Sequence, residues 1–112
     1  FNPLYHYSKG KLHIYKADRM PVGYHSREAG TFTGHEIKIL PGDSVYVFSD
    51  GYADQFGGPD DKKYSKRKFK SLINEISDLP MDEQHSILEN RFMQWKGNKE
   101  QLDDVIVMGI RF

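Results

Sequence analysis

Two stretches of the chain are apolar at consecutive positions, and this feature limits the possible folds most strongly. The first is Val-Tyr-Val-Phe at residues 45–48, and the second is Val-Ile-Val-Met-Gly-Ile at residues 105–110. Short apolar runs bounded by turn-forming residues are typical of β-strands whose two faces are both covered by other parts of a fold. The sequence therefore predicts a sheet that lies inside a layered structure.

The segment between these two strands has the periodicity of helices. Over residues 65–77, apolar residues recur at the i, i+3, i+4 and i+7 spacing of one helix face. A second helix is predicted to begin near Pro80, with Asp82 and Glu83 in its first turn, and to end at Gly97. The apolar residues assigned to the two helices are Phe69, Leu72, Ile73 and Ile76, followed by Leu88, Phe92 and Trp95.

The first part of the chain has the pattern of strands. Residues 4–7 and 11–17 predict two short aromatic strands around a turn that contains Gly10. Residues 31–40 return to alternation, and Pro41-Gly42-Asp43 supplies the residues of a tight turn. The order of strands, two helices and a returning strand predicts an α+β fold with two antiparallel helices packed on a sheet.

The composition indicates one globular domain and excludes several classes of protein. A length of 112 residues is that of a single compact domain. Sixteen basic and sixteen acidic residues balance, so nucleic acid is not expected as a partner. No apolar run approaches the ~20 residues that cross a bilayer, so direct membrane contact is not expected. The chain has no cysteine, which suits a reducing compartment, and its N-terminus indicates a cut inside a domain.

Acidic residues mark one end of each apolar strand. Asp50 follows the first strand, and Asp103-Asp104 precede the last one. If these strands are antiparallel neighbours, Asp50 and Asp103 meet at one rim of the sheet. Two carboxylates at close range repel each other unless a cation lies between them, and Mg²⁺ or Mn²⁺ suits such hard oxygen ligands. Gly51 would let the backbone turn away and leave the Asp50 carboxylate open.

A plainer interpretation of the same acids stays open at this point. Ser-Asp-Gly is a common turn sequence, and Asp-Asp before a strand often only caps or solubilises it. Short motifs of this kind also match by chance. Spacing alone therefore does not decide between a turn and a metal site.

Four motifs that occur in order resemble a known family. They are Pro-Gly-Asp at 41–43, Ser-Asp-Gly at 49–51, the helical pair, and Gln-Leu-Asp-Asp at 101–104 before the last strand. With Asn2-Pro3 and the Met-Pro-Val-Gly-Tyr loop at 20–24, they resemble the C-terminal half of a metal-dependent (type 2C, PPM) serine/threonine phosphatase of the bacterial SpoIIE-like branch. The resemblance implies a partial PPM-type β-sandwich in which residues 1–112 are the C-terminal portion of one phosphatase domain, without its N-terminal half.

The resemblance also implies metal-binding residues and a reaction. Asp50 and Asp103 would each bind one of two Mg²⁺ or Mn²⁺ ions, and Gly51, Asp54 and Asp104 would support the site or add a ligand. In this family the ions hold a water that attacks the phosphorus of phosphoserine or phosphothreonine, and no phosphorylated enzyme forms. The family's other acidic ligands lie in the N-terminal half, and the loop at residues 23–30 does not match them. This chain alone is therefore expected to be inactive, and no residue of it is assigned as a catalytic acid, base or nucleophile.

Partners and a cellular setting follow from the same resemblance. The substrate would be a regulatory protein that carries phosphoserine or phosphothreonine, and sensor domains would precede this part in a larger bacterial signalling protein. That protein would be cytoplasmic, or the cytoplasmic part of a membrane-anchored sensor. Exposed edges of an incomplete sandwich would allow a homodimer.

Two other functions stay open. One is a catalytically dead pseudophosphatase that acts as a protein-interaction or regulatory module. The other is a small Ca²⁺- or Mg²⁺-binding structural domain that is complete in itself and unfolds cooperatively.

Other notable residues are expected to have structural roles. Five lysines and one arginine between Lys62 and Lys70 could attract phosphate, with the loop at 56–63 as a flap, but the exposed face of an amphipathic helix is the favoured interpretation. Phe92 and Trp95 are expected in the core rather than on a partner surface. The serines lack a nucleophile-elbow motif. The histidines show no metal-binding spacing and are assigned to packing: His6, His13, His25, His35 and His85.

Overall fold

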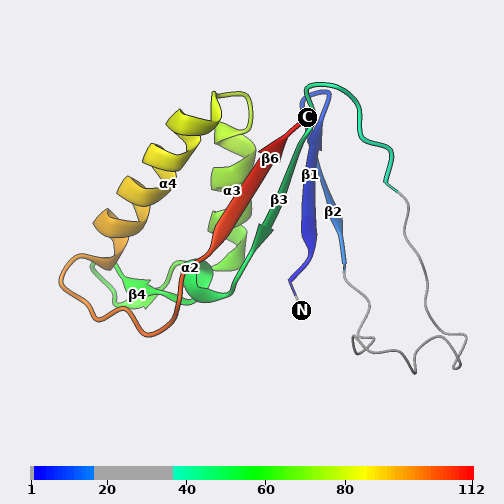
Figure 1. Cartoon of the computed structure of the whole chain (residues 1–112). Helices are drawn as coiled ribbons and strands as arrows, with labels where there is room; N and C mark the ends of the chain where they lie inside the picture. Colours follow the sequence, from blue (N-terminus) through cyan, green and yellow to red (C-terminus); the bar gives the residue numbers. More distant parts are fainter. Residues whose placement is uncertain (1, 17–36) are drawn as a thin grey trace, which may run out of the picture.

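The computed structural model describes residues 2–16 and 37–112, and these form a four-stranded antiparallel sheet with helices on one face (Figure 1). The sheet order is β2-β1-β3-β6, so the two ends of the described chain pair through β3 in the middle. The predicted α+β fold is confirmed. The strands of the sheet are β1 (Leu4–Ser8), β2 (Lys11–Tyr15), β3 (Ser44–Phe48) and β6 (Val107–Arg111).

The helices and a small hairpin lie between β3 and β6 in the chain. The predicted helical pair is present as α3 (Lys66–Ile76) and α4 (Met81–Lys96), and Figure 1 shows the two helices side by side. A four-residue helix, α2 (Gly51–Asp54), and a hairpin of β4 (Phe56–Gly57) and β5 (Lys62–Lys63) precede them. No helix within the described ranges is both long and apolar enough to cross a membrane.

Each of the two predicted turns has a glycine at a positive φ angle. Lys9 and Gly10 join β1 to β2 with φ values of 50° and 77°, which is the geometry of a two-residue hairpin turn. Gly42 has a φ of 90°, and the Asp43 N–H donates to the Leu40 carbonyl at 3.0 Å, which closes the second turn. The strand predicted at residues 31–40 is absent from residues 37–40, and the remainder of it lies outside the described residues.

The core lies between the sheet and the helices, and aromatic rings dominate it. Phe48 of β3 packs against Phe69 of α3 with ring centroids 4.7 Å apart, and Tyr5 of β1 lies 4.8 Å from Phe48. The predicted helix stripe is fully buried, as is Phe92, so these predictions are confirmed. The remaining members of the core include Tyr7, Tyr46, Tyr52 and Ala53.

A buried polar network fixes the turn between α3 and α4 to the sheet. The Tyr46 hydroxyl donates to Gln84 Oε1 at 2.7 Å, and Gln84 Nε2 donates to the Leu79 carbonyl at 2.8 Å. Arg111 of β6 donates to the same carbonyl and to that of Ser77, both at 2.7 Å. Because every turn carbonyl named here has a donor, the helical pair is held at one position on the sheet.

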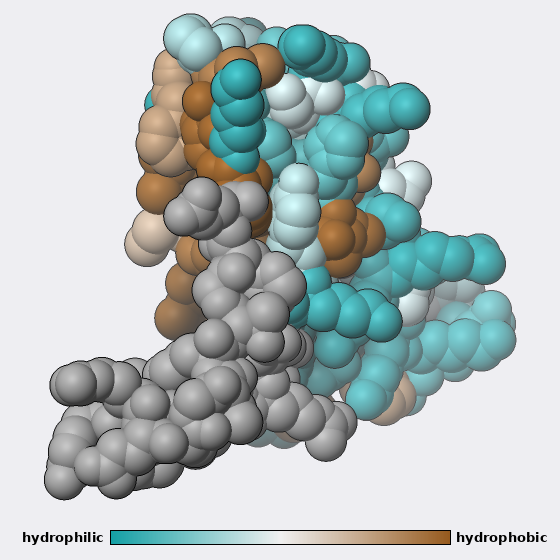
Figure 2. All heavy atoms as spheres, turned by 90° about the vertical axis from the view of Figure 1, so that its right-hand side faces the viewer, coloured by the Kyte–Doolittle hydropathy of each residue, from teal (hydrophilic) through white to brown (hydrophobic). Residues whose placement is uncertain are grey.

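The opposite face of the sheet is exposed at β3 and β6, where the described residues cover only the face toward the helices and not both faces as predicted. Val47 is 42% exposed, and its cross-strand neighbour Met108 is 53% exposed. Ile110 on the same face is 45% exposed. Figure 2, which views the molecule from the right-hand side of Figure 1, shows apolar side chains gathered beside a hydrophilic surface. The apolar runs therefore carry enough apolar area for a second layer that the described residues do not supply.

Candidate metal site

The pairing of β3 with β6 brings the two acidic segments to one rim of the sheet. The strands are antiparallel neighbours, with Phe48 opposite Val107, so the condition under which the sequence places the two acids together is met. The Ser49 N–H donates to the Ile106 carbonyl at 2.9 Å and continues the ladder beyond the strand ends. Asp50 therefore lies beside the segment that carries Asp103 and Asp104.

Ser49 connects the two segments through its side chain. Its hydroxyl donates to the Asp104 carbonyl at 3.1 Å and accepts the Ile106 N–H at 3.0 Å. No role was predicted for Ser49 beyond its place in the Ser-Asp-Gly motif. The position of a serine directly before Asp50, at the end of a strand, was the available signal for this linking role.

Gly51 is required here for space and not for a sharp turn. It is the first residue of α2, and a Cβ atom built on it would lie 2.1 Å from the Asp104 carbonyl oxygen. The same atom would lie 3.2 Å from Val105 Cα. Since backbone atoms cannot give way as a flexible side chain can, only glycine lets the two segments approach this closely.

The Asp50 carboxylate is not used by the turn that it begins. Asp50 occupies the N-cap position of α2, yet its side chain makes no capping hydrogen bond. The side chain is 53% exposed, and its one ion pair within the described residues is to Lys66 Nζ at 3.7 Å. The turn interpretation of Ser-Asp-Gly therefore leaves this carboxylate unexplained, whereas a cation-binding role would use it.

The other acids predicted at the site each make a local contact through the side chain or the backbone. The Asp103 carboxylate accepts the Asp104 N–H at 2.8 Å, so one of its oxygens already has a donor. Asp54 forms an exposed ion pair with Lys63 at 3.7 Å. Asp104 contributes its backbone carbonyl to Ser49, and its side chain is exposed. Across residues 2–16 and 37–112, no three His, Cys, Asp or Glu side chains are grouped closely enough to hold a metal ion.

Tyr52 anchors α2, and with it Asp50, to the helical layer. Its hydroxyl donates to the Leu88 carbonyl of α4 at 2.7 Å, and its ring lies 5.1 Å from Phe69 and 5.0 Å from Phe92. Burial raises the pKa of the Tyr52 hydroxyl well above its usual range, so this group remains a neutral donor. The contacts of Tyr52 therefore connect the rim of the sheet to the hydrophobic core.

Gln55 holds the loop that carries Asp103. Its buried side chain donates to the carbonyls of Phe56 and Glu100, both at 2.9 Å. Trp95 Nε1 donates to the Gln55 carbonyl at 2.8 Å, and the Gly58 N–H donates to the Trp95 carbonyl at 3.0 Å. Trp95 was predicted in the core, and it is half-buried, because it also closes over the hairpin beside the rim.

The histidines of the described part take no part in this rim. His6 is buried on a strand face and contacts Asp43, as predicted for a packing role. His13 stacks near it with ring centroids 5.8 Å apart, and His85 lies on α4 near Glu89. His25, His35 and the loop at 23–30 lie outside the described residues.

Comparison with known proteins decides the family of the chain. The family model described as Stage II sporulation protein E (SpoIIE) matches residues 2–112. The chain belongs to the SpoIIE family. The predicted resemblance is therefore confirmed over nearly the whole sequence.

Two solved structures share the fold of this SpoIIE-family chain. The SiaA-PP2C domain of Pseudomonas aeruginosa superposes with a TM-score of 0.82 and 26% identity, over 98% of this chain and 43% of that one. The phosphatase domain of the cell fate determinant SpoIIE from Bacillus subtilis superposes with a TM-score of 0.56 and 14% identity, over 98% of this chain and 47% of that one. No similar sequence was found among curated proteins. The chain thus has the fold of part of a PP2C domain and spans less than half of either structure.

Proposed function

We propose that this chain is the C-terminal part of a metal-dependent phosphatase domain that acts on phosphoserine or phosphothreonine in a protein substrate. Asp50 and Asp103 would bind Mg²⁺ or Mn²⁺, with Asp54, Asp104 and the close approach at Gly51 in support. The observation that carries this proposal is the Asp50 carboxylate, which is exposed at the strand end and caps no helix. Membership of the SpoIIE family supports the assignment of these acids.

The chemistry of the rim fits such an ion. Carboxylate oxygens are the ligands that Mg²⁺ and Mn²⁺ prefer, and one Asp103 oxygen stays free of the local backbone hydrogen bond. When bound, the metal would lower the pKa of water and offset charge on the phosphoryl oxygens. Ser49 and Gly51 would keep the two acidic segments at a fixed separation, which rigid metal sites require.

Lys66 would have two roles at this site. Without a cation it lies 3.7 Å from Asp50 and partly neutralises it. A bound cation would take over that neutralisation, because it carries more charge and lies closer to the carboxylate oxygens. The Lys66 ammonium would then be available to the phosphate of a substrate.

Calorimetric titration of MnCl₂ into the full-length protein tests the metal assignment. Asp50→Ala and Asp103→Ala are each expected to weaken Mn²⁺ binding by more than about tenfold, because loss of supporting groups alone commonly costs that much. Asp60→Ala, which removes an exposed acid of the β4–β5 loop, is the matched control and should bind as the unmutated protein does. Unchanged binding in both rim variants would refute the assignment.

Release of phosphate from a phosphoserine peptide tests the activity separately. The full-length protein should release phosphate only with Mg²⁺ or Mn²⁺, and Asp50→Asn should abolish release. Metal binding that depends on Asp50 and Asp103, without any release above a matched blank, would instead favour the pseudophosphatase function.

A further inference from the structure

The basic run at residues 62–70 divides into two groups in three dimensions. Three of its cations have partners: Lys63 pairs with Asp54, Lys66 pairs with Asp50, and Lys68 Nζ lies 4.5 Å from the Trp95 ring centroid. The second group is Lys62, which lies in β5 and does not line the groove described below, together with Arg67 and Lys70. Within the described part of the chain, none of these three forms an ion pair.

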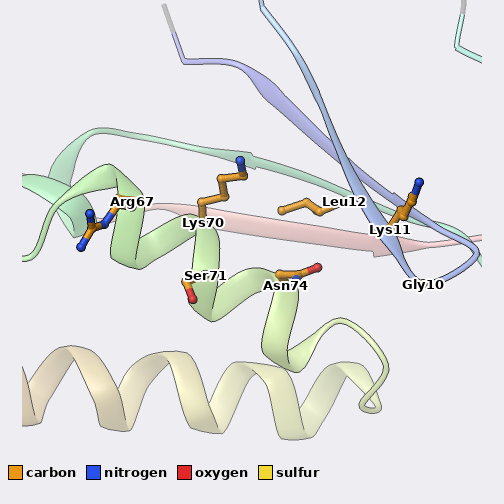
Figure 3. A pocket seen from close by; sticks show the side chains of 7 residues that line it. All are labelled: Gly10, Lys11, Leu12, Arg67, Lys70, Ser71 and Asn74. Atoms are coloured by element: carbon orange, nitrogen blue, oxygen red, sulfur yellow. The ribbon is translucent and has the colours of Figure 1, made fainter.

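Arg67 and Lys70 line a groove between α3 and the β1–β2 hairpin. The groove has a volume of about 420 Å³, and Lys11 of β2 lines it on the side across from α3 (Figure 3). Ser71 and Asn74 continue the same face of α3, and half-buried Leu12 contributes the apolar part of the wall. All three charged residues that line the groove are cationic. A chain with no net charge has therefore concentrated positive charge at one place.

We propose that this groove binds an acidic segment of the phosphoprotein substrate, close in sequence to the phosphorylated residue. This inference rests on the proposed phosphatase function. The groove begins at Arg67, the neighbour of Lys66, whose ammonium lies 3.7 Å from the carboxylate of Asp50. If the phosphorylated residue of a polypeptide is bound at the rim, the residues that flank it would therefore lie beside Arg67 and Lys70.

The dimensions of the groove suit a short extended peptide. From Lys66 to Asn74 the helix rises about 12 Å, at ~1.5 Å per residue. An extended chain covers that distance with about four residues, at ~3.3 Å each. Acidic residues within about four positions of the phosphorylated residue would therefore reach the cations. The cationic side chains are exposed, so they can pair with such acids without the cost of burying a charge.

The lining favours a peptide over other polyanions. Single-stranded nucleic acid is held largely by stacking on aromatic rings, and no aromatic residue of the described chain lines this groove. A membrane surface would need large apolar side chains around the cations, and only Leu12 is present. Ser71 and Asn74, by contrast, offer side-chain groups that can donate hydrogen bonds to a peptide backbone and accept them from it.

Fluorescence anisotropy with a labelled hexaglutamate peptide tests the groove without any catalysis. The full-length protein is compared with a variant that carries Lys11→Gln, Arg67→Gln and Lys70→Gln. A second variant with Lys62→Gln, Lys96→Gln and Lys99→Gln has the same change in net charge at sites away from the groove. We expect binding to weaken about tenfold in the first variant only, since three exposed ionic contacts are lost. Added salt should weaken binding to the unmutated protein.

Two results would overturn the proposal. One is equal loss of affinity in both variants, which would mean that net charge and not the groove attracts the peptide. The other is tighter binding, through the same three cations, of an RNA oligonucleotide of equal length or of phosphatidylserine vesicles.

A kinetic comparison separates this inference from the proposed function. Hydrolysis of p-nitrophenyl phosphate should be equal in the unmutated protein and the groove variant, whereas KM for a glutamate-flanked phosphoserine peptide should rise several-fold in the variant only. Equal KM values would refute the groove while the phosphatase function stands. Selective peptide binding in a protein without phosphatase activity would support the groove and refute the function.

Discussion

His6 and Asp43 form a buried contact between β1 and the Pro-Gly-Asp turn, with His6 Nε2 2.8 Å from Asp43 Oδ2. Both residues are 4% exposed. The same carboxylate oxygen accepts the Leu40 N–H at 2.8 Å, and the Asp43 carbonyl accepts the Phe112 N–H at 2.8 Å. One residue thus ties the turn, the first strand and the end of the chain together.

The contact between His6 and Asp43 should make the free energy of unfolding depend on pH in the acid range. The Leu40 N–H and, after it, the side chains of His6 and Ser8 lower the pKa of Asp43 from 3.8 to about 2, although burial opposes them. The ionised form therefore stabilises the fold above pH 3.8, and this contribution is lost as the pH falls through 2.

Urea denaturation at a series of acid pH values checks this linkage. Asp43→Asn should lower the unfolding free energy at neutral pH and should flatten its decline below pH 3.8. Asp60→Asn, which changes an exposed acid, should keep the unmutated profile. A parallel decline for all three proteins would show that Asp43 is not the group that titrates.

Ser49→Ala should weaken both the fold and the metal site. The change removes one hydrogen bond that Ser49 donates and one that it accepts, at a cost of about 1 kcal/mol in unfolding free energy. Mn²⁺ affinity in calorimetry should fall several-fold, because Asp103 and Asp104 lose their side-chain link to β3. Ser49→Thr keeps the hydroxyl and should restore the affinity. If Ser49→Ala bound Mn²⁺ normally, the link would have no part in positioning the acids.

Gly51→Ala should destabilise the fold and weaken Mn²⁺ binding, although it adds only one methyl group. The added methyl group would meet the Asp104 backbone at 2.1 Å, and the two segments would have to separate. We expect a loss of about 1–3 kcal/mol in urea denaturation, typical of overpacking, together with weaker Mn²⁺ binding. Ser86→Ala on the exposed face of α4 is a control for a neutral change. Full stability of Gly51→Ala would mean that the close approach is not maintained in solution.

The local elements of this fold could be predicted from the sequence because their signals are local. The stripe of Phe69 and its partners, the turn at Gly10 and the stop at Gly97 each depend on residues within a few positions of one another. The antiparallel pairing of β3 with β6 was a condition of the sequence argument about the two acids, and the structure meets it. The helix α2 was missed because four residues are too few to show a period.

Long-range polar contacts could not be predicted in the same way. His6 and Asp43 lie 37 positions apart, and no pattern in the sequence links them. The Asp104 carbonyl, whose close approach requires a glycine at position 51, is likewise distant from that position in the sequence. The predicted cover on the second sheet face is not supplied by the described residues at Val47 and Met108. Apolar runs report the layers of a complete fold, whereas this chain spans 43% of the SiaA-PP2C structure that it matches.

The buried pair of Tyr46 and Gln84 should behave as one unit. Tyr46→Phe leaves Gln84 Oε1 without its 2.7 Å donor, which should cost about 1–3 kcal/mol of unfolding free energy. Gln84→Leu should cost less, because Arg111 still donates to the Leu79 carbonyl. A double-mutant cycle in urea should show that the double variant loses less than the sum of the two single losses. Additive losses would contradict the direct bond.

The open sheet face should make the 112-residue chain self-associate. Val47 and Met108 are cross-strand neighbours on that face, and with Ile110 they form a continuous apolar surface that reaches the edge strand β6. Apolar surface of this kind next to a free strand edge promotes pairing between copies. Sedimentation equilibrium should therefore show an apparent mass that rises with protein concentration.

Met108→Lys with Ile110→Lys should reduce that association, since charges on an exposed sheet face oppose pairing. Both positions are about half exposed, so the unfolding free energy should change by no more than about 0.5 kcal/mol for each of them. Ser86→Lys with Asn90→Lys adds the same charge on the exposed surface of α4 and should leave association unchanged. Equal association of both double variants would show that the copies meet elsewhere, and a chain that is monomeric at every concentration would show that this face does not bind a second copy.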